Sequence, residues 1–264
     1  MKRISIILWL ISVMILSIGA SSVISNADRV KVASGTLSLP DGSYVVHRET
    51  CDINADGENE DIYVYAHKKS EEDVFCEDVN IAVIDAEGLL RRTNYSGVSG
   101  SILQTCISDF NGDGKKDILV ILNNGDKHMC IIGDFAHSIP KNIISAKDLK
   151  GLQMKLHFID GFAVSAELEN GQMFSVNVSA QKEVLKKKGF FSDDGKYLNG
   201  TPVISEIMQI KPVDHDFGSN LIFTQKLYIK EDNTYLCSID AEMEYTGDTL
   251  LVKRIDYYTQ NNNP

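Results

Sequence analysis

Hydrophobic positions recur with a period of two along most of the chain beyond residue 30. Short runs rich in β-branched and aromatic residues alternate with turn signals, which is the pattern of half-buried strands. The clearest runs are residues 61–68, 79–85, 117–124, 162–170, 173–179, 221–229 and 235–245. Asn-Gly and Asp-Gly pairs between runs favour the positive φ of tight hairpins. The pattern therefore predicts an all-β chain of antiparallel hairpins, with short helices only at residues 142–150 and 181–188.

An acidic motif repeats along this chain. DINADGENEDIYVY begins at Asp52, DFNGDGKKDILVIL begins 57 residues later at Asp109, and a weaker version, VDHDFGSNLIF, begins at Val213. Four units of about 50 to 57 residues would fill residues 40–260, and this length suits a four-stranded propeller blade. We therefore expect a β-propeller-like array of about four antiparallel blade units, either closed by a strand at residues 30–39 or left as an incomplete propeller.

The two stronger copies place oxygen-bearing side chains at alternating positions of a short loop. Hard cations such as Ca²⁺ take six to eight oxygen ligands, and glycine at position 6 permits the sharp turn that gathers them. In the second loop the predicted ligands are Asp109, Asn111, Asp113, the carbonyl of Lys115, and Asp117. In the first loop they are Asp52, Asn54, Asp56, the carbonyl of Glu58, and either Glu60 or Asp61. Calcium is favoured over Mg²⁺, which keeps more of its bound water.

An EF-hand loop begins in the same way, but it needs a glutamate at position 12 and helices on both sides. Position 12 is Tyr63 in the first loop and Val120 in the second, and both loops have predicted strands as flanks. In the third copy, Asp214 and Asp216 remain, but the third acid and the position-9 carboxylate are missing. We therefore expect β-hairpin metal loops at the first two copies and no metal at the third.

With ligands that end at position 9, the two loops resemble those of FG-GAP/VCBS-type repeat proteins. The blades of that family, as in the integrin α-subunit, carry Asp-x-Asn/Asp-x-Asp-Gly-x-x-Asp between their first two strands. The second loop matches this pattern fully, and the first matches with Glu60 at position 9 or with a one-residue insertion. The resemblance covers roughly residues 44–260 and implies calcium-stabilised propeller hairpins in a small secreted bacterial protein.

The N-terminus predicts export. Two basic residues precede an apolar run, and small residues then offer cleavage sites at Ala27 and, as a second candidate, Ala20. We expect residues 1–27 to be a signal peptide and residues 28–264 to be one secreted or cell-surface domain. An uncleaved membrane anchor is the alternative, although the apolar run falls short of the roughly 20 residues of a spanning helix.

Charge and cysteine content narrow the class of partner. Two of the 26 basic residues belong to the predicted signal, so the remaining 24 stand against 37 acidic residues and give a net charge of −13. This balance argues against nucleic-acid binding and suits cation binding. The five cysteines are widely spaced beside apolar runs, so we expect small buried side chains, with one or two disulfides left open.

The sequence contains no recognisable catalytic arrangement. Its six histidines are scattered, and neither a His-Glu-x-x-His nor a Gly-x-Ser-x-Gly motif occurs. We therefore assign no catalytic and no cofactor-binding residues. The favoured hypothesis is a monomeric, secreted, calcium-binding repeat module that binds an extracellular protein or glycan. The alternatives are an extracellular hydrolase or lyase with its site on the loop face, and a purely structural envelope protein.

Overall fold

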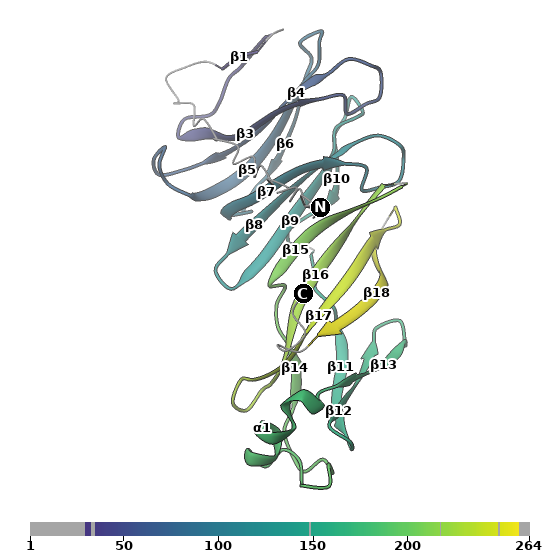
Figure 1. Ribbon diagram of the computed structural model, residues 1–264. Coiled ribbons are helices and arrows are strands. Elements are labelled where there is room, and N and C mark those ends of the chain that lie inside the picture. Colours follow the sequence, from purple (N-terminus) through teal and green to yellow (C-terminus); the bar gives the residue numbers. More distant parts are fainter. Residues whose placement is uncertain (1–29, 33–34, 148, 217, 248, 259–264) are drawn as a thin grey trace, which may run out of the picture.

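The computed structural model describes residues 30–258 except for residues 33–34, 148, 217 and 248 (Figure 1). The predicted signal peptide lies outside the described residues. Within them the chain is all-β, as predicted, with one α-helix and one short 3₁₀ helix. Over this part of the chain, no helix has both the length and the apolar character needed to cross a bilayer.

The elements follow one another as a long series of strands interrupted once by helix. In chain order they are β1 Val30–Val32, β2 Gly35–Leu37, β3 Ser43–Cys51, β4 Glu60–His67, β5 Phe75–Ile84, β6 Leu90–Tyr95, β7 Gly100–Ser108, β8 Asp117–Asn124, β9 Lys127–Asp134, β10 Lys141–Ile144, β11 Met154–Ile159, β12 Ala163–Leu168, β13 Met173–Asn177, η1 Ser179–Gln181, α1 Lys182–Lys187, β14 Pro202–Ile204, β15 Gln209–His215, β16 Gly218–Ile229, β17 Thr234–Tyr245 and β18 Leu250–Tyr258.

Two four-stranded antiparallel meanders join into one eight-stranded sheet, which forms the upper part of Figure 1. The first meander is β3 to β6, and the second is β7 to β10. They join because the first residues of β5 pair with the start of β7, whereas the rest of β5 pairs with β6. Each meander carries one acidic loop between its first two strands. The 57-residue repeat of the sequence therefore corresponds to two four-stranded units with the same order of strands.

The C-terminal half is built differently. β11, β12 and β13 form a three-stranded sheet, and β14 to β18 form a five-stranded sheet whose central strands, β16 and β17, are 12 residues each. The structure does not show a four-blade propeller. β1 pairs with β2 in a small hairpin of its own, so the prediction that residues 30–39 close the last unit is wrong.

The two helix predictions had opposite outcomes. α1 confirms the predicted helix at residues 181–188, and its Leu185 is buried in the core. The helix predicted at residues 142–150 is wrong over all of its described residues, because Lys141–Ile144 is an edge strand that pairs with β9 and residues 145–147 and 149–150 are turn and irregular chain. Pairing with β9 gives the backbone N–H and C=O groups of this segment hydrogen-bond partners on a neighbouring strand. A short isolated helix would have to satisfy these groups within itself.

β8 connects the two main hydrophobic cores of the molecule. Its alternating side chains reach opposite faces of the sheet. Ile118, Val120 and Leu122 pack into the core of the eight-stranded sheet, whereas Leu119 and Ile121 pack into the core shared with the C-terminal sheets. The loop immediately before β8 is thus anchored to two cores at once.

All five cysteines are free thiols in this structure. Cys76, Cys130 and Cys237 are buried, which confirms the prediction of small buried side chains at these three positions. Burial raises the pKa of both the Cys130 and Cys237 thiols to about 12, so they are poor nucleophiles.

Candidate metal centre

The two acidic loops have the same hydrogen-bond scheme, position by position. In each loop the position-1 carboxylate accepts the N–H groups of positions 4 and 6, and the position-3 amide oxygen accepts that of position 5. The position-5 carboxylate accepts the N–H of position 7, and the position-9 carboxylate accepts that of position 2. The ten donor-to-acceptor distances lie between 2.6 and 3.0 Å. The two loops therefore fold in the same way, with side-chain oxygens at positions 1, 3, 5 and 9 accepting N–H groups of the same turn.

Backbone conformation explains why the loops can turn so tightly. Positions 4 and 6 both have positive φ, at Ala55 and Gly57 in the first loop and at Gly112 and Gly114 in the second. A Cβ added at any of these three glycines would meet nothing within 4 Å, so glycine is favoured there by its backbone freedom and not by lack of space.

The structure distinguishes the two candidates for the closing position of the first loop. The Glu60 carboxylate is buried, and its Oε2 accepts the N–H of Ile53 at 2.9 Å. The Asp61 carboxylate belongs to the neighbouring strand face instead, where its Oδ1 accepts hydrogen bonds from Arg48 and Thr50, both at 3.2 Å. Glu60 is therefore the counterpart of Asp117, and the inclusion of Asp61 among the candidate ligands is not supported by its position.

For Glu58 and Lys115, the structure shows the backbone N–H donated to the position-5 carboxylate. The role predicted for them uses the carbonyl of the same residue. Ligation by these two carbonyls stays a prediction.

The second loop gathers more acidic groups than its own sequence contains. Asp117, at the start of β8, lies directly opposite Asp134, at the end of β9, and both are almost fully buried. Ligand atoms of Asp113, Asp134 and His137 lie within 4.8 Å of one another. Asp134 and His137 are therefore further candidate ligands beside Asp113.

Sequence reasoning missed Asp134 because it lies outside the nine-residue motif, although a signal for it was present. The hairpin turn at Gly125-Asp126 sets the β8–β9 register, which pairs Asn124 with Lys127 and, seven steps away on each strand, Asp117 with Asp134. Counting back from a predicted two-residue turn would have placed the two acids together.

The electrostatics of Asp117 show how unfavourable this cluster is without a cation. Burial, together with the nearby charges of Asp134 and Asp113, raises the pKa of its carboxyl to about 7, although the N–H groups of Phe110 and Asn111 act in the opposite direction. A buried carboxylate beside other carboxylates favours its protonated form unless an opposite charge is supplied.

This raised pKa predicts a pH dependence for the metal-free protein. Folding favours protonated Asp117, so its stabilising contribution is complete below the usual carboxyl pKa near 3.8 and is lost as the pH rises through about 7. We expect the free energy of unfolding of metal-free protein to fall between about pH 4 and pH 7, by up to about 1.4 kcal/mol per pH unit. Guanidinium unfolding of the wild type and of Asp117→Asn measures this, because the variant should lack this part of the decline. Equal declines in both proteins would contradict the assignment.

In the first loop, a buried arginine lies beside the position-9 carboxylate. The buried guanidinium of Arg91, on β6, places Nη2 3.7 Å from Oε1 of Glu60. Burial raises the pKa of Glu60, while the Ile53 N–H and Arg91 act in the opposite direction. Arg91 also donates from Nη1 to the carbonyl of Phe135, the residue after Asp134. One side chain thus connects the first loop to the segment that carries an acid of the second.

The two loops also contact each other directly, and the second loop contacts the C-terminal sheet. The Lys116 N–H donates to the carbonyl of Ile53 at 2.9 Å, and the Lys116 ammonium lies 3.2 Å from Sγ of Cys51. The Ser219 N–H donates to the carbonyl of Asp109 at 2.7 Å. A Cβ on Gly218 would approach that carbonyl oxygen to 2.9 Å, so this contact requires a glycine.

The weak third copy of the motif forms part of a β-hairpin. Asp214 lies in β15 and accepts the hydroxyl of Ser219 at 2.6 Å, and Ser219 in turn contacts the hydroxyl of Ser108, also at 2.6 Å. This hairpin packs against the second loop and supports it from the C-terminal sheet.

Comparison with family models, with curated proteins and with solved structures returns no match for this chain.

Proposed function

We propose that this chain is a secreted calcium-binding module, related to FG-GAP/VCBS-type repeats, in which Ca²⁺ stabilises hairpin loops and the module binds an extracellular protein or glycan. The two meanders with their acidic loops would be two blades of an incomplete propeller. The observation that carries the proposal is the shared hydrogen-bond scheme of the two loops, in which oxygen atoms from alternating residues accept the N–H groups of one short turn.

A hard divalent cation suits the second loop best. Side-chain oxygens of Asp109, Asn111, Asp113 and Asp117, the Lys115 carbonyl and the neighbouring Asp134 would together approach the six to eight oxygens that Ca²⁺ takes. The ion would also remove the unfavourable proximity of buried carboxylates that raises the pKa of Asp117. We therefore propose the second loop as the tighter site.

The first loop would be the weaker site. Its position-9 acid is Glu60, which already has a buried guanidinium beside it. A cation entering this loop would gain less from neutralising Glu60, and it would be repelled by Arg91. The proposed ligands here are Asp52, Asn54, Asp56, the Glu58 carbonyl and Glu60.

The physical role of the ion would be to hold strands in register. The second loop joins β7 to β8, and β8 belongs to both main cores. Fixing the first residue of β8 to the residues that follow β7 would therefore stabilise a part of the chain on which the rest of the fold depends.

The test is thermal unfolding of the purified protein in chelator and in millimolar Ca²⁺. A ligand that binds only the folded state stabilises it by about 2.7 kcal/mol at a hundredfold excess over Kd. We expect the melting temperature to rise with calcium concentration, and to rise less with Mg²⁺ at the same concentration. Identical melting temperatures in chelator and calcium would refute the proposal.

A further inference from the structure

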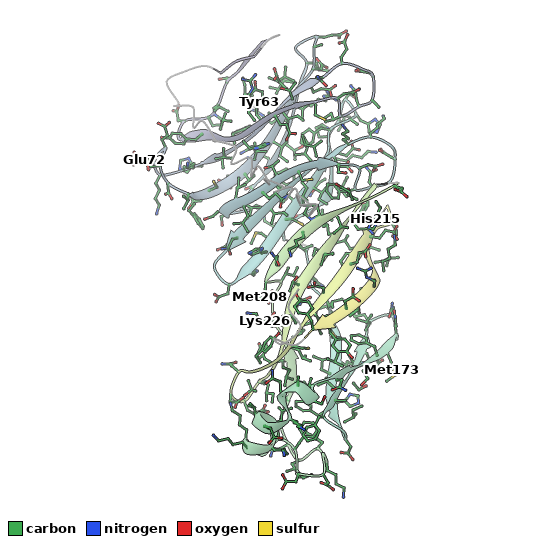
Figure 2. All side chains as sticks on the ribbon, viewed as in Figure 1. Tyr63, Glu72, Met173, Met208, His215 and Lys226 are labelled. Carbon is green, nitrogen blue, oxygen red and sulfur yellow. The ribbon has the colours of Figure 1, made fainter. Side chains whose placement is uncertain are left out.

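A second feature, far from the acidic loops, lies where the eight-stranded and five-stranded sheets meet. It is a hollow of about 760 Å³, within the range of roughly 300 to 1,000 Å³ typical of small-molecule sites. Its floor is the outward face of β16, β17 and β18, and its rim includes Asp126 from the β8–β9 turn and Met208 from the segment before β15. Met208 and Lys226, which both line the hollow, are labelled in this part of the molecule in Figure 2. We call this hollow the tyrosine hollow.

Three tyrosines line the hollow. Tyr228 on β16 pairs directly with Tyr235 on β17. Tyr258 on β18 pairs with Ser238 on β17, which in turn pairs with Lys226 on β16. Hydrogen bonds orient two of the rings: the Tyr235 hydroxyl contacts that of Ser238 at 3.1 Å, and the Tyr258 hydroxyl donates to Asp240 at 3.2 Å. All three rings are partly exposed. The sheet thus presents fixed aromatic surface next to hydroxyl groups.

The junction that forms the hollow is a defined contact between the sheets. The N–H of His128, on β9, donates to the carbonyl of Ile207 at 2.7 Å, which joins the β8–β9 hairpin to the segment that leads into β15. The Ser205 hydroxyl accepts the N–H of Lys226 at 2.8 Å, and this bond holds the same segment to the floor strand. Backbone hydrogen bonds and the Ser205 hydroxyl therefore connect the rim to the floor.

Charge and chemistry define the ligand class. The lining carries one cation, Lys226 on the floor, and one anion, Asp126 on the rim, so it is close to neutral. Aromatic faces take up C–H surface, while hydroxyl and amide groups donate to and accept from alcohols. An anionic ligand such as a nucleic acid is disfavoured by the chain's net charge of −11. A peptide added as a strand would use a sheet edge and not a face.

From this combination we infer that the tyrosine hollow is a binding site for a neutral oligosaccharide, with its sugar rings stacked on Tyr228, Tyr235 and Tyr258. The inference deepens the proposed function and rests on it, because it assigns the extracellular ligand to the glycan class and gives it a place. The site is distant in sequence from both acidic loops, so sugar binding should not require an intact second loop.

The test is isothermal titration of the purified protein with three neutral probes: cellohexaose, xylohexaose and the tetramer of N-acetylglucosamine. We expect at least one to bind, and Tyr228→Ala and Tyr235→Ala each to weaken that binding by about tenfold or more, as for an aromatic contact residue. Tyr235→Phe should retain most of the affinity, because it keeps the ring. Tyr257→Ala is the matched control, since Tyr257 is exposed on the same strand as Tyr258 but points to the opposite face.

Absence of binding of all three probes to the wild type would overturn the inference. Binding that is equally tight in the two alanine variants would overturn it as well. A calcium melting series on the same samples separates this failure from failure of the proposed function. Protein that gains stability from Ca²⁺ but binds no probe would refute the sugar site alone. Protein that binds a probe through these tyrosines without any response to Ca²⁺ would refute the calcium proposal alone.

Discussion

Asp113→Ala should remove calcium binding at the second loop, and with it most of the rise in melting temperature that Ca²⁺ produces. The carboxylate of Asp113 is exposed, is the ligand predicted at position 5, and lies within 4.8 Å of side-chain atoms of Asp134 and His137 that could also bind a metal. Its loss leaves too few oxygens for a hard cation that takes six to eight. In chelator the variant should melt close to the wild type, because the Asp113 side chain is exposed and accepts one loop N–H. Differential scanning fluorimetry with and without Ca²⁺ measures both.

Asp214→Ala is the matched control for this prediction. Asp214 belongs to the weak third copy and contacts Ser219, outside the loop itself. The calcium-dependent rise should therefore remain in this variant. The assignment fails if Asp113→Ala and Asp214→Ala respond to Ca²⁺ alike.

The second large effect is expected at Arg91. Arg91→Met removes a buried guanidinium and leaves Glu60 buried without its opposite charge. Breaking a buried ion pair by removing one partner typically costs about 3 to 5 kcal/mol, and the carbonyl of Phe135 also loses its donor. We expect a loss of this size in the free energy of unfolding, measured by guanidinium denaturation in chelator.

Two further variants make the Arg91 result interpretable. The double variant Arg91→Met with Glu60→Gln should recover part of the lost stability, because the uncompensated charge is gone. Arg92→Met is the control, since the neighbouring Arg92 is exposed. A loss at Arg91 no larger than the loss at Arg92 would contradict the role assigned to the buried ion pair.

The acidic loops could be predicted from sequence because their geometry is local. Each hydrogen bond of the scheme joins residues no more than seven positions apart, so alternating acids and a glycine at position 6 contain nearly all the information. The choice between Glu60 and Asp61 needed one further fact, the pairing of Cys51 with Glu60 across the β3–β4 ladder. Strand register decides which face a side chain occupies, and a shift of one residue reverses it.

The features that sequence did not reveal all depend on contacts between distant segments. Arg91, on β6, contacts both Glu60 and Phe135, the residue that follows β9. Neither contact has a sequence signature. The tyrosine hollow likewise joins the β8–β9 turn to strands about 100 residues later in the chain. In the C-terminal half, period-two patterning identified strands correctly but could not tell a four-stranded unit from a sheet with two 12-residue central strands.

The most direct test of the central claim is the number of calcium ions bound per chain, measured by equilibrium dialysis followed by metal analysis. At a calcium concentration that saturates the tighter site, wild-type protein should bind one ion more than Asp113→Ala, and Asp214→Ala should bind as many as the wild type. Equal metal content in the wild type and Asp113→Ala would contradict the account.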